Sequence, residues 1–299
     1  MAYEDYWGKK LLEGFRTQLE LEDEDLKRYF QKPIPEVLYH YSSTEKLKGI
    51  LNTNVFWASN INDLNDRSEY QYGIDVIRRV LTSIDSSFNS NFIGLFIDQI
   101  DKFERDIGSI FILSLSTNGD SLPLWQAYSN LDGYNIGLDL HFVLNNTPPD
   151  ILCHGHVIYS KEKQEQIINE KATDLYEFYK EFAPNCEKDE FNIIFGFIFT
   201  QVLNYITLFK HPAFEHENEY RFVYYVNGST ESRIKVTGQG KPYVEITTEI
   251  LDYLSNELPL VEIRMGPKNV NNKEDVLSIF INNENTREIN IFKSDIPLR

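Results

Sequence analysis

The sequence has few cysteines and no excess of basic residues. Its 299 residues include only two cysteines, Cys153 and Cys186. Two cysteines are too few for a disulfide framework, and they do not have the spacing of a metal site. With 29 Lys and Arg against 46 Asp and Glu, the formal net charge is −17. This charge excludes an extended basic groove for nucleic acid, so any contact with a nucleic acid must be local.

The sequence also lacks the patterns of secreted and membrane proteins. No charged N-terminal region is followed by the apolar stretch of a signal peptide. The most apolar segment, 191–209, is interrupted by Thr200, Gln201, Asn204 and Tyr205. We therefore interpret it as a buried helix rather than a membrane span, and we expect a cytoplasmic protein that does not contact a membrane.

Apolar and aromatic residues are abundant enough for a large core. They make up 41% and 14% of the chain, which argues against disorder and for a globular protein. Residues 1–35 have apolar groups at helical spacing and predict an N-terminal helical appendage. Residues 36–299 are predicted to form a single domain with a helical insertion at about 161–210.

The order of predicted elements is typical of the α+β class, because strands cluster and helices are inserted between them without regular alternation. Strands are predicted at 37–42, 55–59, 109–117, 133–140, 150–160, 217–226, 233–237, 243–247 and at both ends of 260–292. Helices are predicted at 3–30, 43–51, 70–84, 121–129, 161–182, 187–209, 249–256 and within 260–292.

Metal ligands and phosphate loops are weakly represented. Cys153, His154 and His156 lie close together, but no second Cys/His cluster accompanies them. We interpret them as residues of a strand and predict no metal. The segment 265–270, MGPKNV, has a single glycine and is interpreted as a turn between a strand and a helix.

Two strand segments carry polar residues on one face. In 38–42, LYHYS, alternation places His40 and Ser42 on the same side. In 112–116, ILSLS, it does the same for Ser114 and Ser116. The second strand leads into a predicted helix, whose aromatic residues are Trp125 and Tyr128. A core histidine and serines that merely fill a strand are the structural alternatives.

A third segment, ENEYRFVYYV at 217–226, begins with charged residues and continues as an apolar strand. Alternation predicts Glu217, Glu219 and Arg221 on one face, and large apolar groups on both faces. The strand is therefore predicted to be covered on both sides. The carboxylates at its start are either a structural ion-pair cluster or a site.

Taken in order, the three segments resemble the ADP-ribosyltransferase superfamily. LYHYS, followed by a helix ending in GIL, is similar to the first motif of the poly(ADP-ribose) polymerase-like and diphtheria-toxin-like branch, and NEYRFVY is similar to its third. Ser114, Ser116 and the spacing of Glu217 and Glu219 look more like the toxin branch that uses Arg, a Ser-Thr-Ser strand and a Glu-x-Glu loop. His40 stands where that branch has Arg.

The chain also resembles an uncharacterised bacterial domain family over roughly residues 36–292. The motifs of that family are an H-Y-S/T start, an N-D-x-x-E loop, a W-x-x-Y helix and an E-x-E-Y-R strand. In this sequence they correspond to 40–42, 65–69, 125–128 and 217–221.

The resemblance to the transferases implies NAD as substrate, no metal, and a split mixed β-sheet core with helical insertions and an N-terminal helix. It makes Glu219 the catalytic carboxylate, which would bind the ribose 2′-OH more strongly as positive charge develops in an oxocarbenium-like transition state. Glu217 would act as a general base on the acceptor. His40 and Ser42 would hold the ribose and the nicotinamide amide.

The remaining NAD-binding residues implied by the resemblance are aromatic, hydroxyl and cationic. Tyr41, Trp125 or Tyr128 would offer a ring to nicotinamide. Ser114 and Ser116 would line the central strand. Arg221 would either pair with Glu219 at rest or bind the pyrophosphate.

The leading hypothesis from the sequence is a mono-ADP-ribosyltransferase that modifies a macromolecule, either protein or nucleic acid. Such an enzyme would act as a toxin or phage-defence effector, with an antitoxin or a defence-system protein as partner. An NAD glycohydrolase with the same site is one alternative. A non-enzymatic binding module of a defence system is another.

Overall fold

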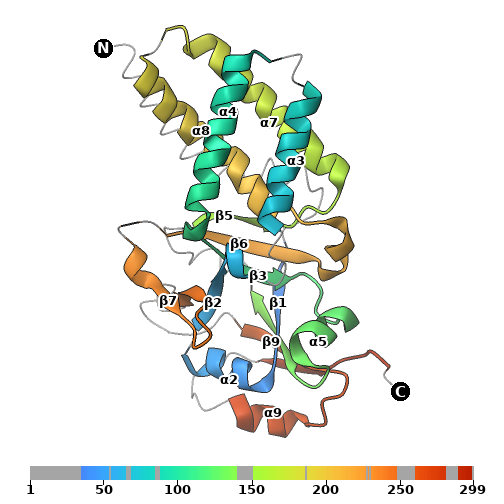
Figure 1. Cartoon of the computed structure of the whole chain (residues 1–299). Helices are drawn as coiled ribbons and strands as arrows, with labels where there is room; N and C mark the ends of the chain where they lie inside the picture. The colour runs from blue at the N-terminus through green and yellow to red at the C-terminus, as the bar shows by residue number, and fades with distance from the viewer. Residues whose placement is uncertain are drawn as a thin grey trace. The chain divides into compact units, whose positions relative to one another are not determined.

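The computed structural model describes residues 35–53, 55–64, 69–84, 88–139, 151–185, 187–226, 228, 230–247, 260–280 and 289–297 (Figure 1). Contacts divide the chain into two compact units that each combine separate segments. The described part of the first unit comes from Ser68–Ile107 and Gly155–Pro212 and is mainly helical. The second comes from Pro35–Arg67, Gly108–His154 and Ala213–Arg299 and is built on a sheet. The predicted helices at 3–30 and 249–256 lie outside the described residues.

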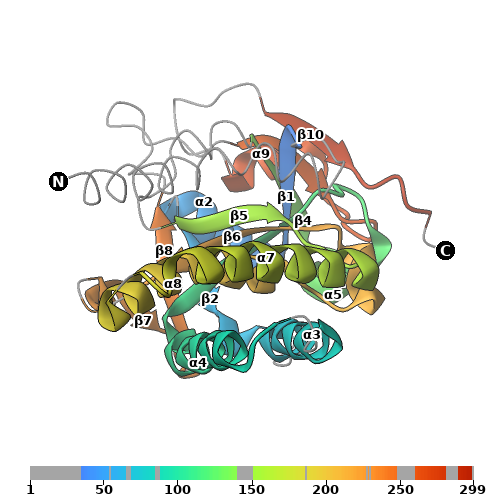
Figure 2. The same cartoon turned by 90° about the horizontal axis from the view of Figure 1, so that it is seen from above.

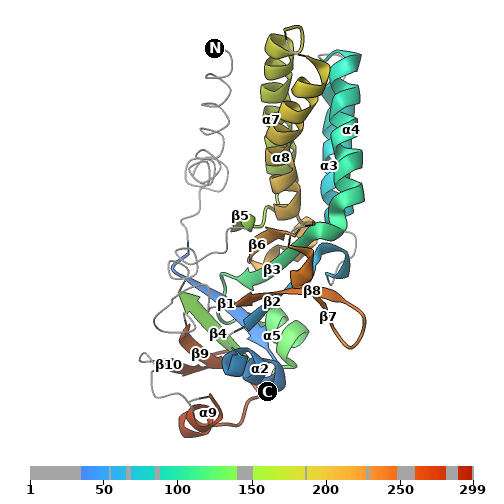
Figure 3. The same cartoon turned by 90° about the vertical axis from the view of Figure 1, so that its left-hand side faces the viewer.

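In the described part of the chain, the helical unit contains four long helices: α3 (Glu69–Ile84), α4 (Ser90–Asp106), α7 (Lys161–Phe182) and α8 (Lys188–Leu208). Figure 3 shows them side by side, and in Figure 2 α7 and α8 lie on one side with α3 and α4 on the other. The insertion predicted at about 161–210 corresponds to α7 and α8. The contacts group it with α3 and α4, which come from an earlier segment.

Helix α4 was not predicted, although the sequence contains its signals. The Asn89 side chain accepts a hydrogen bond from the backbone N–H of Phe92 and so caps the helix. Apolar residues then recur at helical spacing, and Phe92, Phe96 and Ile100 are buried. A cap followed by an apolar stripe is the pattern of a helix that packs on one side.

Helix α8 contains the stretch Phe191–Leu208, which is long and apolar enough to cross a membrane by length and composition alone. Half of this stretch is buried inside the protein. Phe195, Phe199 and Ile206 are at most 1% exposed. A Cβ added at Gly73 of α3 would lie 2.5 Å from Ile206, so α3 and α8 approach closely there. In this structure α8 packs as a core helix of the helical unit.

The sheet unit is an α+β structure with a mixed ten-stranded sheet. The strands run in the order β10-β9-β4-β1-β3-β2-β8-β7; β6 pairs with β3, and β5 pairs with β6. Pairing is parallel between β9 and β10 and antiparallel in the other registers that define the sheet. The bounds are β1 (Val37–Ser42), β2 (Val55–Asn60), β3 (Ile110–Ser116), β4 (Tyr134–Asp139), β5 (Ile151–His156), β6 (Glu219–Tyr225), β7 (Ile234–Val236), β8 (Pro242–Thr247), β9 (Leu260–Met265) and β10 (Asn290–Lys293).

Shorter helices complete this unit: α2 (Thr44–Thr53) joins β1 to β2, α5 (Leu122–Ser129) follows β3, and α9 (Lys273–Phe280) lies between β9 and β10. The 3-10 turns η2 (Ile61–Asp63) and η5 (Glu231–Arg233) also belong to this unit. Two further 3-10 turns, η3 (Ile107–Ser109) and η4 (Pro212–Glu217), precede β3 and β6.

Strand β3 is the centre of the sheet, and two strands share one of its edges. In the pairing of β1 with β3, Tyr39 lies opposite Ser116. In the pairing of β2 with β3, Ser59 lies opposite Ile112 and Asn60 lies opposite Phe111. β1 continues along β4, and β2 continues along β8. The sheet therefore splits along the middle of β3.

The two faces of this sheet differ in chemistry. Because directly paired residues project to the same side, the register assigns every strand residue to a face. One face is apolar and includes Leu38, Phe111, Leu113 and Phe222, all at most 6% exposed. The other carries Glu219, and we call it the Glu219 face.

Candidate functional site

A buried ion pair on β6 is the centre of the candidate site. Glu219 and Arg221 are two residues apart and so project from the same face. Arg221 donates from Nε to one carboxylate oxygen of Glu219 at 3.1 Å and from Nη2 to the other at 3.0 Å. The Arg221 side chain is only 2% exposed, and the Glu219 side chain is 7% exposed. Charges this buried must be compensated, and the bidentate geometry compensates both at once.

The serines of β3 lie directly across from this pair. Ser114 pairs with Arg221 and Ser116 with Glu219, so all four project to the Glu219 face. The hydroxyl of Ser116 donates to the carbonyl oxygen of Glu217 at 2.7 Å and accepts from the backbone N–H of Asn118 at 3.0 Å. Ser116 thus fixes the entry of β6, whereas Ser114 is partly exposed beside Arg221.

The prediction that Glu217 shares the strand face of Glu219 is wrong. Glu217 ends the 3-10 turn η4, and β6 begins at Glu219. Asn218 between them has a φ of 45°, in the left-handed region, so the alternation of a strand does not extend back through it. The carbonyl oxygen of Asn218 accepts from the backbone N–H of Thr117, which ties this turn to the end of β3.

Strand β1 brings its tyrosines, and not its histidine, to the Glu219 face. Tyr39 pairs with Ser116, so Tyr39 and Tyr41 project to the same side as Glu219. His40 and Ser42 project to the opposite, apolar face. The structure thus brings Glu219, Arg221, Ser114, Ser116 and Tyr41 to one face and leaves His40 and Ser42 on the other.

Tyr41 and Trp125 hold the loop that follows β3. The Tyr41 hydroxyl donates to the carbonyl oxygen of Asn118 at 2.7 Å and accepts from the backbone N–H of Ser121 at 2.9 Å. Burial raises the pKa of this hydroxyl. The Tyr41 and Trp125 rings meet edge to face at 4.8 Å, and Trp125 donates to Asp120. Tyr128 is 37% exposed on the same helix, α5.

His40 is held in its neutral form on the apolar face. Burial, with a smaller contribution from Lys46, lowers the pKa of His40 to about 4. Its ring meets the Phe56 ring edge to face at 5.6 Å. A neutral imidazole at physiological pH can accept or donate a hydrogen bond but offers no positive charge to a phosphate.

This pKa predicts that acid destabilises the sheet unit through His40. The unfolded chain binds the proton near pH 6.5 and the folded chain only near pH 4, so stability is complete above pH 6.5 and falls as the pH drops toward 4. His40→Gln should reduce the loss of unfolding free energy between pH 7 and pH 5 by up to about 2 kcal/mol. Urea unfolding at the two pH values measures it, with the exposed His216→Gln as control. An unchanged loss in His40→Gln would contradict the assignment.

A second Glu-x-Arg pair lies on β9 of the same face, and the sequence analysis missed it. Arg264 donates from Nη2 to Glu262 at 2.9 Å and lies over the Phe292 ring at 5.1 Å. The segment VEIRM repeats the Glu-x-Arg pattern of NEYRF, which is the signal that could have revealed it. Register places Glu262 in one row with Gly137, Tyr39, Ser116 and Glu219. Four strand spacings separate the two glutamates, about 19 Å.

The ring of Tyr39 lies between these two pairs and against two glycines. A Cβ at Gly119 would lie 2.7 Å from the Tyr39 ring, and one at Gly137 would lie 3.2 Å from it. Any larger residue at Gly119 would displace the ring. Burial raises the pKa of Tyr39, and the nearby Glu262 carboxylate adds to this effect.

The other residues singled out by sequence have structural contacts. His154 makes a 2.7 Å hydrogen bond from Nδ1 to the Tyr220 hydroxyl and stacks on Tyr220 and Phe222. Glu69 lies in the helical unit, where it pairs with the buried Lys210 at 2.9 Å. Within the described residues, no group of three or more His, Cys, Asp or Glu side chains could hold a metal ion.

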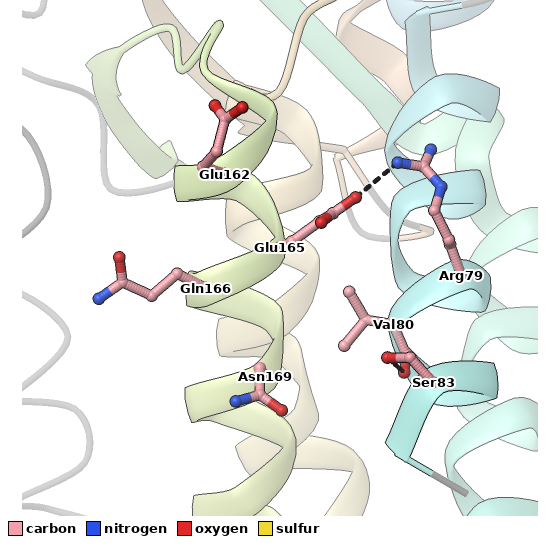
Figure 4. A pocket seen from close by; sticks show the side chains of 7 residues that line it. All are labelled: Arg79, Val80, Ser83, Glu162, Glu165, Gln166 and Asn169. Carbon is pink, nitrogen blue, oxygen red and sulfur yellow. Dashed lines mark hydrogen bonds and ion pairs between the residues drawn. The ribbon is translucent and has the colours of Figure 1, made fainter.

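A groove of about 620 Å³ lies between α3 and α7 of the helical unit (Figure 4). Its lining is polar apart from Val80, and Arg79 pairs across it with Glu165 at 2.7 Å. None of the residues predicted for the NAD site lines it.

Comparison with known proteins gives one family match. A family model described as a protein of unknown function (DUF2971) matches residues 124–222. The match runs from α5 through β6 and so includes Trp125, Tyr128, Glu219 and Arg221. The searches of curated proteins and of solved structures found no match. The chain is therefore similar to this family over a third of its length.

Proposed function

We propose that the Glu219 face binds NAD and that the protein transfers ADP-ribose from it to a macromolecule. The observation that carries the proposal is the buried Glu219–Arg221 pair, which lies across from Ser114 and Ser116 on the neighbouring strand. A carboxylate, a guanidinium and two hydroxyls would suit a ligand with hydroxyl and anionic groups. The choice of NAD among such ligands rests on the resemblance of the β3 and β6 sequences to ADP-ribosyltransferases.

In the proposed reaction, ligand binding exchanges the partner of Arg221. The guanidinium of Arg221 matches a phosphate as well as it matches the Glu219 carboxylate, because both accept two parallel hydrogen bonds. A pyrophosphate at Arg221 would let Glu219 turn to a ribose hydroxyl. Arg221 would then be paired with the pyrophosphate, and the Glu219 carboxylate would keep a hydrogen bond to the hydroxyl until positive charge develops on the ribose.

Glu219 would then stabilise the transition state. As the bond from nicotinamide to ribose breaks, positive charge develops on the ribose, and a carboxylate hydrogen-bonded to its 2′-OH interacts more strongly with it. Ser114, which is partly exposed across from Arg221, would donate to the same ligand. Because His40 projects from the other face, it would only support strand β1. Tyr39 and Tyr41 would contact the nicotinamide ring.

The wild-type protein tests this proposal directly. Incubation with NAD labelled in its adenylate phosphate, together with a cell lysate, should release nicotinamide and transfer the label to a macromolecule. Release of free ADP-ribose without transfer would identify an NAD glycohydrolase instead. Calorimetry should detect NAD binding by the protein alone. If the protein neither binds NAD nor releases nicotinamide, both the transferase and the glycohydrolase are contradicted. The non-enzymatic binding module is then the remaining hypothesis.

A further inference from the structure

An exposed pair of stacked aromatic rings lies at the β2–β8 end of the Glu219 face. The Trp57 and Tyr243 rings stack with centroids 4.1 Å apart and an interplanar angle of 29°. Trp57 is nevertheless 54% exposed. Tyr243 stacks against one side of the indole and is itself partly buried, whereas more than half of Trp57 is accessible to solvent.

The strand beside this pair carries one cation, Lys235, which is paired with the Glu245 carboxylate opposite Trp57. Lys235 of β7 pairs directly with Tyr243 in the register, and its ammonium group lies at the Glu245 carboxylate. Residues 231–247 contain three cationic residues, at 233, 235 and 241, against two glutamates, whereas the whole chain has a net charge of −17. At physiological salt, charges beyond about 8 Å are largely screened, so a ligand at the rings meets this local excess of one positive charge rather than the net charge of the whole chain.

We infer that Trp57 and Tyr243 form a binding site for an unpaired base of single-stranded nucleic acid. Bases stack on exposed aromatic rings whatever their sequence, and a nearby lysine can contact the adjoining phosphate. The small size of the surface favours this ligand over a protein. A stable protein interface buries roughly 800 Å² on each partner. Val236, the nearest exposed apolar residue of β7, projects to the opposite face, because Lys235 rather than Val236 pairs with Tyr243.

The position of Trp57 relative to Arg221 gives the inference its functional content. β2 pairs with β3 at Ser59 and Ile112. Trp57 precedes Ser59 by two residues and Ser114 follows Ile112 by two, so both lie in the same direction from this antiparallel pair. Strand geometry limits the separation of the Trp57 and Ser114 Cα atoms to at most about 19 Å, even where the strands diverge, and Arg221 lies one strand spacing of about 5 Å beyond Ser114. If the proposed ADP-ribose transfer is correct, the acceptor class is therefore single-stranded nucleic acid. Only this acceptor role rests on the proposed function, because base binding itself needs no NAD.

Fluorescence anisotropy with labelled dT12 and rU12, in the absence of NAD, tests the inference. Trp57→Ala should weaken binding roughly 5- to 150-fold, the loss expected for one stacked base. Trp57→Phe should restore much of the affinity because it keeps a flat ring. The matched control is Phe292→Ala, which removes an exposed ring at the other end of the same face and should leave binding unchanged.

Salt dependence provides a second readout. Because few cations surround the rings, the affinity should fall with salt at a slope equivalent to about one or two phosphate contacts. Absence of oligonucleotide binding at millimolar concentration, or equal affinities of wild type and Trp57→Ala, would overturn the inference. Either result could coexist with full release of nicotinamide from NAD. Failure here is thus distinguishable from failure of the proposed function.

Discussion

Glu219→Gln is expected to lower the rate of nicotinamide release from NAD by about 10²- to 10³-fold, the typical cost of removing one preorganised group that stabilises transition-state charge. The substitution keeps the size of the side chain and one hydrogen-bond acceptor. It removes the negative charge that would interact with the developing oxocarbenium ion. The loss should therefore appear in kcat, with a much smaller change in NAD affinity.

The matched control for this experiment is Glu262→Gln. Glu262 is also a glutamate two residues before an arginine, on a strand of the same face, and it also accepts from that arginine. It lies four strands away from Glu219, so its loss should leave the release of nicotinamide within a few-fold of wild type. Equal rates for wild type and Glu219→Gln would remove Glu219 from the mechanism.

The folded state of the Glu219 variant needs its own check. Glu219→Gln leaves the buried Arg221 without a formal counter-charge from Glu219. The rates should therefore be measured well below the unfolding midpoint of the variant. Near-ultraviolet circular dichroism, which reports on the packed aromatic residues of the sheet unit, shows whether the fold is retained.

Much of the fold follows from local pattern in the sequence. Strand β3, IFILSLS, is apolar at every position except Ser114 and Ser116, which is typical of a central strand, and β3 is central in the sheet. Helices α7 and α8 begin and end within a few residues of the predicted bounds because apolar periodicity defines them over more than five turns. The α+β class is therefore accessible from local pattern, whereas the mixed sheet was expected only from the resemblance to the transferases.

The face of β1 could not be predicted in the same way. LYHYS has rings and polar atoms on both sides, so period two separates Tyr39 and Tyr41 from His40 without saying which set joins Glu219. The pairing of Tyr39 with Ser116 decides the matter. This contact joins residues 77 positions apart, and nothing in either segment encodes it. A one-residue shift in register would have reversed the assignment.

The start of β6 and the second charged pair were missed for different reasons. The positive φ of Asn218 interrupts the alternation from Glu217 to Glu219, and asparagine tolerates that conformation without being restricted to it. Glu262 and Arg264 were visible as a repeated pattern. Their relation to Glu219 requires the order of five strands, which comes from long-range pairing.

Arg221→Met is expected to lower the unfolding free energy of the sheet unit by about 3–5 kcal/mol, because it removes the bidentate cation that compensates the buried Glu219 carboxylate. The double substitution Glu219→Gln with Arg221→Met should recover most of that loss, since a neutral pair of similar volume carries no desolvated charge. Urea unfolding followed by tryptophan fluorescence measures both. Two of the three tryptophans, Trp57 and Trp125, lie in the sheet unit.

The control for the pair is Arg264→Met. Its partner Glu262 and Arg264 itself are 14% and 18% exposed, so water compensates part of what the substitution removes. The loss of unfolding free energy in Arg264→Met should be closer to the value of about 0–1 kcal/mol that is typical of exposed ion pairs. A loss of this small size for Arg221→Met would show that water reaches Glu219 in the folded protein. The exchange of Arg221 between carboxylate and pyrophosphate would then be unnecessary, because a hydrated carboxylate needs no partner. A loss of unfolding free energy in the expected range, recovered by the double substitution, would show that the Glu219 carboxylate is desolvated and depends on Arg221 in the free protein.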